Sequence, residues 1–417
     1  MLDFPAVLGV QWNYSYDTEW WLGVFEDEAQ PGRHLGVELS LLHAGTPEDC
    51  SPTAGLAVLF VGISDTATGK YTQSSIIYLL NETQAVTSTA VPYNVSVRGV
   101  GVGGSAGGGA SGSAGATGVR AGVEQGSAGP NSQRVYAHNV PNWTSAFDLE
   151  VATTPALQNV HMAADGFLKD VLVYFMQVAQ PDLAGTATIT KDGETIRGKG
   201  SVWLQHIWGT FPKLARPAAS ASGGTGAGAG AGTGTRAAHA ARAAAAMAAS
   251  GGGATAPAAP LFALVWTWQC VKLDNGMALS LTQFADTAAA PGASVAPGVA
   301  PGAAPAAPAA SLLHYLNVVN MTTGESHEYT GTEFSIALSD LWVSPVTGHS
   351  YARRSDVRVP AIALNLTWHT LVADNEHFVP GLITYYEAAS LVTGTVGGVA
   401  VSGTGFLEHK VPTSPRK

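Results

Sequence analysis

The chain has 417 residues and a formal net charge of −10 at pH 7, from 20 basic and 30 acidic side chains. Its only adjacent basic residues are the pairs Arg353–Arg354 and Arg416–Lys417, so no nucleic-acid surface is predicted. Its longest apolar stretches, such as Leu261–Trp266, fall far short of the roughly 20 residues that a membrane-spanning helix needs. We therefore expect no integral membrane segment.

Three tracts of biased composition interrupt the chain. Residues 99–130 are mostly Gly, Ser, Ala and Val, residues 214–260 mostly Ala and Gly, and residues 287–310 mostly Ala, Pro and Gly. Such residues bury too little apolar surface to offset the chain entropy lost on ordering. We predict disordered insertions at 99–130 and 287–310 and a low-complexity linker at 214–260. The linker separates an N-terminal domain, 1–213, from a C-terminal domain, 261–417.

The sequence between these tracts has the two-residue period of β-strands. In residues 34–43, Leu and Val side chains alternate with Glu and Ser, which predicts a strand with one buried face. KDGE (191–194) and LDNG (273–276) are favourable hairpin loops. No strong amphipathic helix is visible, so the chain is predicted to be all-β and antiparallel. Further strands are expected at 56–64, 74–80, 170–178, 185–190, 201–208, 261–273, 277–284, 362–372 and 385–394.

Six asparagines begin N-x-S/T triplets, more than the composition gives by chance. They predict glycosylation and a route through the secretory pathway, with the leader absent from this sequence; if they are coincidental, the alternative is the cytoplasm. Cys50 and Cys270 would permit one disulfide, but their spacing does not decide whether they pair. The six sites are Asn13, Asn81, Asn94, Asn142, Asn320 and Asn365.

Seven segments in order resemble the hydroxyneurosporene synthase (carotenoid 1,2-hydratase) family and its AttH-type relatives. The resemblance covers nearly all of the sequence outside the tracts, and it implies two lipocalin-like antiparallel β-barrel domains packed together. The segments are TEWWLG (18–23), GKGSVWLQHIWG (198–209), WTWQCVKLDNG (266–276), LWVSPVTGHSY (341–351), ADNEHF (373–378), YYE (385–387) and VSGTGFLEH (401–409).

Departures from the family pattern bear on the chemistry. The family carries an acid at the position of Gln205, and in its hydratase branch that Asp protonates a terminal alkene, so that water captures the resulting carbocation. A carboxylic acid can give a proton in this way, whereas a glutamine amide cannot. The family's Tyr is Trp203 here, the fourth residue of its E-W-W-Y motif is Leu22, and its Asp-His pair is Val7-Leu8.

Strand alternation places Trp203 and Gln205 on one face, with His206 and Trp208 on the other. The resemblance favours the Gln205 side as the cavity side, so Gln205 is interpreted as a ligand-facing group; alternatively, its amide is satisfied by backbone inside a barrel. His206 is a catalytic candidate, but a hydrogen-bonded histidine near the domain interface is the simpler interpretation.

Glu19 is the best remaining acid. Burial among tryptophans would raise its pKa, which suits a proton donor near neutral pH, although it could instead tie a neighbouring strand or an arginine. Aromatic walls can pack a core, hold a polyene or stabilise a cation. The predicted ligand-binding tryptophans are Trp20, Trp21, Trp203, Trp266 and Trp268.

No metal site and no cofactor are predicted. The twelve histidines show no H-x-H or H-E-x-x-H spacing and no Cys cluster exists. Glu376-His377, Glu387 and Glu408-His409 could converge in three dimensions, but nothing in the sequence says so. The G-x-S-x-G match at 103–107 and the other glycines of 99–109 belong to a glycine-rich tract that does not lie between a clear strand and helix, so neither a serine hydrolase nor a dinucleotide site is supported.

Two functions fit these observations. The first is an enzyme that hydrates, isomerises or cyclises a hydrophobic small molecule, such as an isoprenoid, polyketide or phenolic, in an internal cavity. The second is a non-catalytic carrier or sequestering protein for such ligands, derived from an enzyme by replacement of its acid with Gln205.

Overall fold

The computed structural model describes residues 16–44, 56–79, 86–90, 93–99, 119–127, 132–140, 143–152, 160–163, 174–210, 264–286, 311–379 and 383–411. These residues are almost entirely strand, with one short 3₁₀ turn at Pro360–Ile362. None of the described helices has the length and apolar character needed to span a bilayer.

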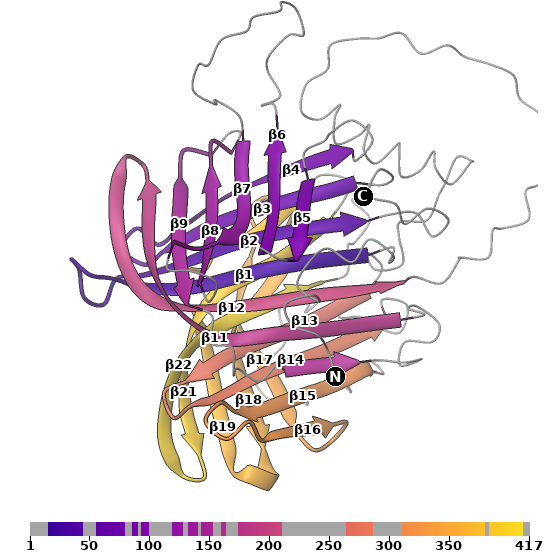
Figure 1. Cartoon of the computed structure of the whole chain (residues 1–417). Helices are drawn as coiled ribbons and strands as arrows, with labels where there is room; N and C mark the ends of the chain where they lie inside the picture. Colours follow the sequence, from indigo (N-terminus) through magenta and orange to yellow (C-terminus); the bar gives the residue numbers. More distant parts are fainter. Residues whose placement is uncertain are drawn as a thin grey trace, which may run out of the picture.

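The first sheet curls around its own core as an antiparallel half-barrel and contains twelve of the described strands, in indigo to pink in Figure 1. Their order is β4-β3-β2-β1-β12-β11-β9-β8-β7-β6-β5, with β10 paired to β11. They are β1 (Tyr16–Asp27), β2 (His34–Ala44), β3 (Leu56–Asp65), β4 (Lys70–Leu79), β5 (Val86–Ala90), β6 (Tyr93–Gly99), β7 (Val119–Gln125), β8 (Ser132–His138), β9 (Ala146–Ala152), β10 (Val160–Ala163), β11 (Tyr174–Lys191) and β12 (Glu194–Thr210).

The second sheet is another antiparallel half-barrel, of ten described strands, drawn mainly in orange to yellow (Figure 1). Its order is β16-β15-β14-β13-β22-β21-β19-β18-β17, with β20 paired to β21. They are β13 (Leu264–Leu273), β14 (Met277–Asp286), β15 (Ser311–Asn320), β16 (Ser326–Thr330), β17 (Ser335–Val343), β18 (Ser350–Val359), β19 (Leu364–Thr370), β20 (Glu376–Val379), β21 (Ile383–Val396) and β22 (Val399–Lys410).

Both predicted hairpin loops are confirmed. Asp192 and Gly193 connect β11 to β12 with φ angles of 52° and 84°, the left-handed pair that a two-residue turn requires. Gly276 has a φ of 80° just before β14. The strands expected at 170–178 and 185–190 are instead parts of the single strand β11, because its ladder with β12 continues across a bulge.

One expectation about the tracts is wrong. Residues 99–130 were predicted to be a disordered insertion, but β7 lies within this range and pairs with β6 and β8. Val119, Ala121 and Val123 alternate along it and are buried in the core of the first sheet. Bias toward Gly and Ala masked this two-residue period. The tracts 214–260 and 287–310 lie outside the described residues, so the domain boundaries beside the linker stay predictions.

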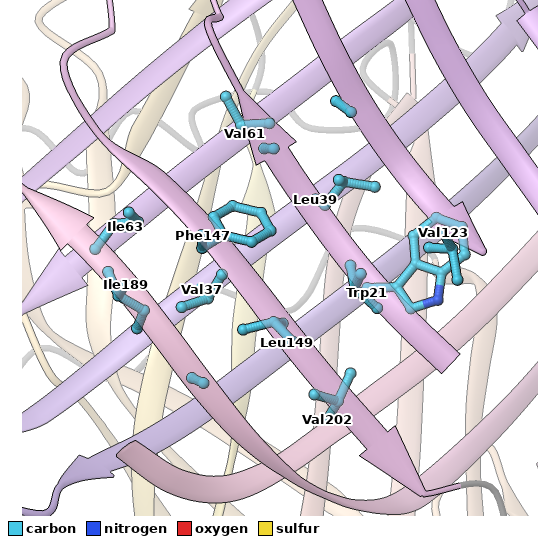
Figure 2. Packing of buried hydrophobic residues seen from close by; sticks show 14 of the residues in the cluster. Trp21, Val37, Leu39, Val61, Ile63, Val123, Phe147, Leu149, Ile189 and Val202 are labelled. Carbon is cyan, nitrogen blue, oxygen red and sulfur yellow. The ribbon is translucent and has the colours of Figure 1, made fainter. Parts of the chain in front are cut away.

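Each half-barrel has its own apolar core. Figure 2 shows how Trp21, Val37, Leu39, Phe147 and Leu149 meet inside the first sheet, from the neighbouring strands β1 and β2 and the distant strand β9. Every second residue of these strands contributes because side chains alternate between the two faces. A similar cluster fills the second sheet; it includes Val271, Leu281, Leu316, Leu366 and Trp368.

The two sheets also contact each other through the faces opposite their cores. The Trp203 and Trp268 rings lie 6.2 Å apart edge to face. Gly36 on β2 lies so close to β21 that a Cβ added there would be 2.3 Å from the Ala389 Cβ. Ser64 Oγ donates to Asn375 Oδ1 at 2.7 Å, which adds a buried polar contact. The face between the sheets is therefore a packed interior that both halves of the chain build.

Candidate functional site

Strand register divides the side chains of β1 and β12 between two environments. Trp21 and Leu204 are cross-strand partners in the core of the first sheet. Alternation places the neighbouring partners Trp20 and Gln205 on the opposite face, toward the second sheet. Trp20 meets Tyr385 of β21 edge to face, with ring centroids 5.9 Å apart.

The residues that meet between the sheets form a group that we call the inter-sheet cluster. It combines aromatic rings with carboxyl groups, and all but two of its members are buried. Its members are Trp20, Glu38, Tyr71, Trp203, Gln205, Trp266, Trp268, His377, Tyr385, Glu387 and Glu408.

Two carboxyl groups face each other within this cluster. Glu387 on β21 and Glu408 on β22 are cross-strand partners, and their side chains are buried. Burial raises the pKa of Glu387 well above its usual value, and the neighbouring Glu408 raises it further. Burial also raises the pKa of Glu408, to about 8, although the Trp266 Nε1–H donates to its Oε1 at 2.6 Å. This pair therefore holds at least one proton at neutral pH.

Glu38 is a hydrogen-bonding centre that joins the sheets. Its Oε2 accepts from His377 Nε2–H at 2.7 Å and from the Tyr71 hydroxyl at 3.2 Å. Its Oε1 accepts from the Tyr385 hydroxyl at 3.4 Å. Tyr71 also contacts His377, whose ring stacks on Tyr385 with centroids 4.6 Å apart. Burial raises the pKa of both tyrosines well above 10, so their hydroxyls remain donors.

Several polar atoms of the inter-sheet cluster have no donor or acceptor among the described residues. Trp268 Nε1 and His377 Nδ1 are buried without a partner. The Glu387 oxygens meet only the Glu408 carboxyl group, to which Glu387 donates when it is protonated. An unsatisfied buried polar group costs about 1–3 kcal/mol, so native proteins rarely gather several. Their concentration between the sheets indicates a place where a ligand or water supplies partners.

The predicted residues Trp20, Trp203, Gln205, Trp266 and Trp268 all lie in this cluster. Gln205 Oε1 accepts a long hydrogen bond of 3.4 Å from the Trp203 indole N–H, so this oxygen has a side-chain partner. Trp268 is the cross-strand partner of Glu408, which brings the tryptophans to the carboxyl pair.

Three predicted residues lie elsewhere. Trp21 packs in the core of the first sheet. Glu19 and His206 are cross-strand partners on that same core side, where His206 Nε2 contacts Asp17 Oδ2 at 2.9 Å. Strands β1 and β12 therefore separate Gln205 from Glu19 and His206, and the catalytic roles of these three residues stay predictions.

Glycosylation sites and cysteines are placed only in part. Asn365 is exposed on β19, and Asn320 is half-buried at the end of β15, where its Oδ1 accepts two backbone N–H groups. Asn94 lies on β6, and Asn13, Asn81 and Asn142 lie outside the described residues. Cys270 is a buried free thiol, and Cys50 lies outside the described residues.

Sequence reasoning did not place Glu38, Tyr71 and Tyr385, and it left Glu387 and Glu408 unassigned. The sequence did carry a signal for three of these residues, because YYE contains Tyr385 and Glu387, VSGTGFLEH contains Glu408, and both are among the family-like segments. That these residues lie together depends on strand pairing and on packing between the sheets, which no spacing in the sequence encodes.

Two curled antiparallel half-barrels with a buried polar and aromatic cluster between them define a two-domain lipocalin-like protein. No family model and no curated protein matches the chain. Solved structures match nearly its whole length. A protein described as an AttH, from Nitrosomonas europaea, has a TM-score of 0.63 and 15% identity, covering 99% of this chain and 97% of that one. Kievitone hydratase from Nectria haematococca has a TM-score of 0.55 and 12% identity, covering 97% and 90%.

At sequence identities this low, the structural similarity shows a shared fold and nothing more. The AttH-type part of the predicted resemblance is therefore confirmed at the level of architecture.

Proposed function

We propose that the chain is an enzyme that adds water to an alkene of an apolar small molecule, or isomerises or cyclises it, with the Glu387–Glu408 pair as proton donor. The observation that carries this proposal is the pair itself. Two carboxyl groups buried face to face are costly for stability, and they keep a proton available at neutral pH.

The proposed hydration step balances as follows. The Glu408 O–H gives its proton to one alkene carbon, so a C–H bond forms as the π bond breaks and the adjacent carbon becomes cationic. The faces of Trp203 and Trp268 stabilise this cation. A water oxygen then bonds to the cationic carbon and returns a proton to the Glu408 carboxylate. Loss of a proton from a neighbouring carbon would instead give isomerisation, and attack by a second alkene would give cyclisation.

The substrate class follows from the cluster's surroundings. Tryptophan, tyrosine and phenylalanine rings suit an apolar or aromatic molecule such as an isoprenoid, polyketide or phenolic. The structural likeness to a protein named kievitone hydratase supports hydration as the reaction class. The resemblance to hydroxyneurosporene synthases supports an isoprenoid alkene, although the Gln205 position means that the acid would come from the second sheet.

A carrier of such molecules is the second candidate. Gln205 favours it, because an amide hydrogen-bonded to Trp203 offers recognition without proton transfer. The two functions differ in one reaction step: the enzyme transfers a solvent-exchangeable proton to a substrate carbon, whereas the carrier transfers none.

The test is incubation in D₂O with a panel of terminal-alkene isoprenoids, prenylated phenols and unsaturated polyketides, followed by mass spectrometry. We expect carbon-bound deuterium in recovered substrate or product, and its loss in Glu408→Gln. Glu26→Gln is the control, since Glu26 is an exposed carboxylate whose acceptor role toward Gly32 N–H an amide retains. Tight binding without deuterium incorporation, equal in both variants, would establish the carrier instead.

We also propose passage through the secretory pathway, supported by the six sequons and by the exposure of Asn365. Endoglycosidase treatment of protein from its native host should lower its mass, and an unchanged mass would contradict secretion.

A further inference from the structure

A second buried cluster lies on the other side of β1 and β12 from the inter-sheet cluster. Asp17, Glu19 and His206 belong to it, and each is about 1% exposed or less. None of them takes part in the reaction proposed above, because the sheet separates them from Glu408. The inference is therefore independent of that function.

The register of the strands brings their donor atoms together. Glu19 and His206 are direct cross-strand partners, and Asp17 lies two residues before Glu19 on the same face of β1. His206 Nε2 is 2.9 Å from Asp17 Oδ2. One ligand atom from each of the three residues lies within 4.8 Å of the other two.

This separation is close to what a shared metal ion requires. Oxygen and nitrogen ligands bind Zn²⁺ at about 2.0–2.2 Å, so two of them are at most about 4.4 Å apart across one ion. Small side-chain rotations would bring the three donors of the cluster onto such a sphere.

The chemical nature of the three side chains limits which metal ions the cluster could bind. Imidazole together with carboxylates suits Zn²⁺, Fe²⁺ and Mn²⁺, whereas Ca²⁺ and Mg²⁺ prefer sites made only of oxygen. Two carboxylates buried this close to one another repel when both are ionised, and a divalent cation would offset both charges.

His43 offers a fourth donor. It is the cross-strand partner of Asp17 on β2, and its side chain is buried. Directly opposite residues of antiparallel strands have Cβ atoms about 4.5–5.5 Å apart, so a side-chain rotation would bring the imidazole to the cluster, although its nitrogens are not among the donor atoms within 4.8 Å of one another.

The geometry assigns to Asp17, Glu19 and His206 a structural site for a divalent transition-metal ion, with His43 as a fourth ligand. Such an ion ties together the three adjacent strands β2, β1 and β12 at one end of the first half-barrel. No metal site was expected from the sequence, because its ligands come from three strands and show no local spacing.

The proposal is tested on untagged, full-length protein. Elemental analysis of protein purified without chelators should find one equivalent of Zn²⁺, Fe²⁺ or Mn²⁺ per chain, and chelation should lower the unfolding temperature. Co²⁺ added to the chelated protein should give visible d–d absorption whose intensity reports a four- or five-coordinate site. These measurements need no variant, so they hold even if a ligand substitution impairs folding.

Asp17→Asn and Glu19→Gln should each lose the bound metal and the stabilisation by added Zn²⁺. The matched control is His327→Ala, which removes an exposed His327–Glu325 pair able to take up Zn²⁺ at the surface. That variant should keep the metal. Absence of metal together with no Co²⁺ spectrum in the wild type would overturn the proposal. So would metal that survives in both cluster variants, or metal that is lost in His327→Ala.

Discussion

Glu387 on β21 and Glu408 on β22 lie directly opposite each other in the ladder, and both side chains are buried between the two half-barrels. Each carboxyl group would ionise freely in water, but here burial disfavours the charged form. The burial of this carboxyl pair therefore affects the free energy of unfolding as well as the chemistry of the site.

The first prediction is a pH-dependent stability. The pKa of Glu408 is raised from 4.5 unfolded to about 8 folded, so its stabilising contribution is complete below pH 4.5 and is lost as pH rises to about 8. The unfolding free energy should fall across this window, by at most about 1.4 kcal/mol per pH unit for one group. Urea denaturation at several pH values measures this slope.

In Glu408→Gln the slope should become shallower, since the amide does not titrate. The control Glu26→Gln should keep the wild-type slope because Glu26 is exposed. A Glu408→Gln variant with the same pH dependence as the wild type would show that Glu408 is ionised in the folded protein.

The second prediction concerns position 205. Gln205→Asp places an acid on the face that carries Trp20 and Trp203, where the related family has its Asp. Hydration of a terminal isoprenoid alkene should rise by about 10²-fold, the scale of general acid catalysis. The measurement is product formation by mass spectrometry at saturating substrate. If the rate does not change while ligand affinity is retained, position 205 does not face the reacting bond.

The third prediction tests the packing of the two sheets. Gly36→Ala would push a Cβ against Ala389, and overpacking of this kind costs about 1–3 kcal/mol. Adding Ala389→Gly to the same chain removes the opposing methyl group. The double variant should therefore recover a large part of the loss, measured as urea midpoint. Lack of recovery would mean that β2 and β21 do not meet at these residues.

Much of this architecture is predictable from the sequence. Strand β2 shows its alternation openly, and the turns at 191–194 and 273–276 carry the Asp-Gly and Asn-Gly pairs that hairpins require. Strand β7 is not predicted from the sequence because Gly and Ala residues obscure its alternation, although Val119 and Val123 are buried.

The site is harder to predict than the fold. Alternation along β12 correctly separates Gln205 from His206. It does not say whether Glu19 on β1 lies on the Gln205 side or on the His206 side of the sheet; the β1–β12 register decides that. The pairing of Glu387 with Glu408 depends on a ladder between β21 and β22, and their approach to Trp203 depends on packing between the sheets. Such contacts are set by tertiary structure.

The fourth prediction concerns the buried ion network that Asp65 forms with Arg33 and Lys191 in the first sheet. Asp65 binds Arg33 through two hydrogen bonds and Lys191 through a third. Burial alone would raise the pKa of Asp65, but these cations and the Ala67 N–H outweigh it and lower the pKa to about 2. The stability that Asp65 contributes is therefore present above pH 3.8 and is lost as pH falls to about 2.

Asp65→Asn should lower the unfolding free energy at pH 7 by about 3 kcal/mol, because buried cations lose a partner. It should also flatten the acid limb between pH 4 and pH 2. Asp192→Asn is the control, since that carboxylate near Lys191 is exposed, and it should change little. Equal effects of the two substitutions would contradict the buried network.

The most direct measurement of the central claim is the infrared absorption of protonated carboxyl groups as a function of pH. Because Glu387 and Glu408 share a buried site, the wild-type protein should show the C=O stretch of a neutral carboxylic acid at pH 7. The band should weaken as pH rises through about 8, where Glu408 ionises, and Glu387→Gln/Glu408→Gln should lack it at pH 7. A wild-type protein without this band at pH 7, or a double variant that keeps it, would contradict the assignment of this pair as the proton donor.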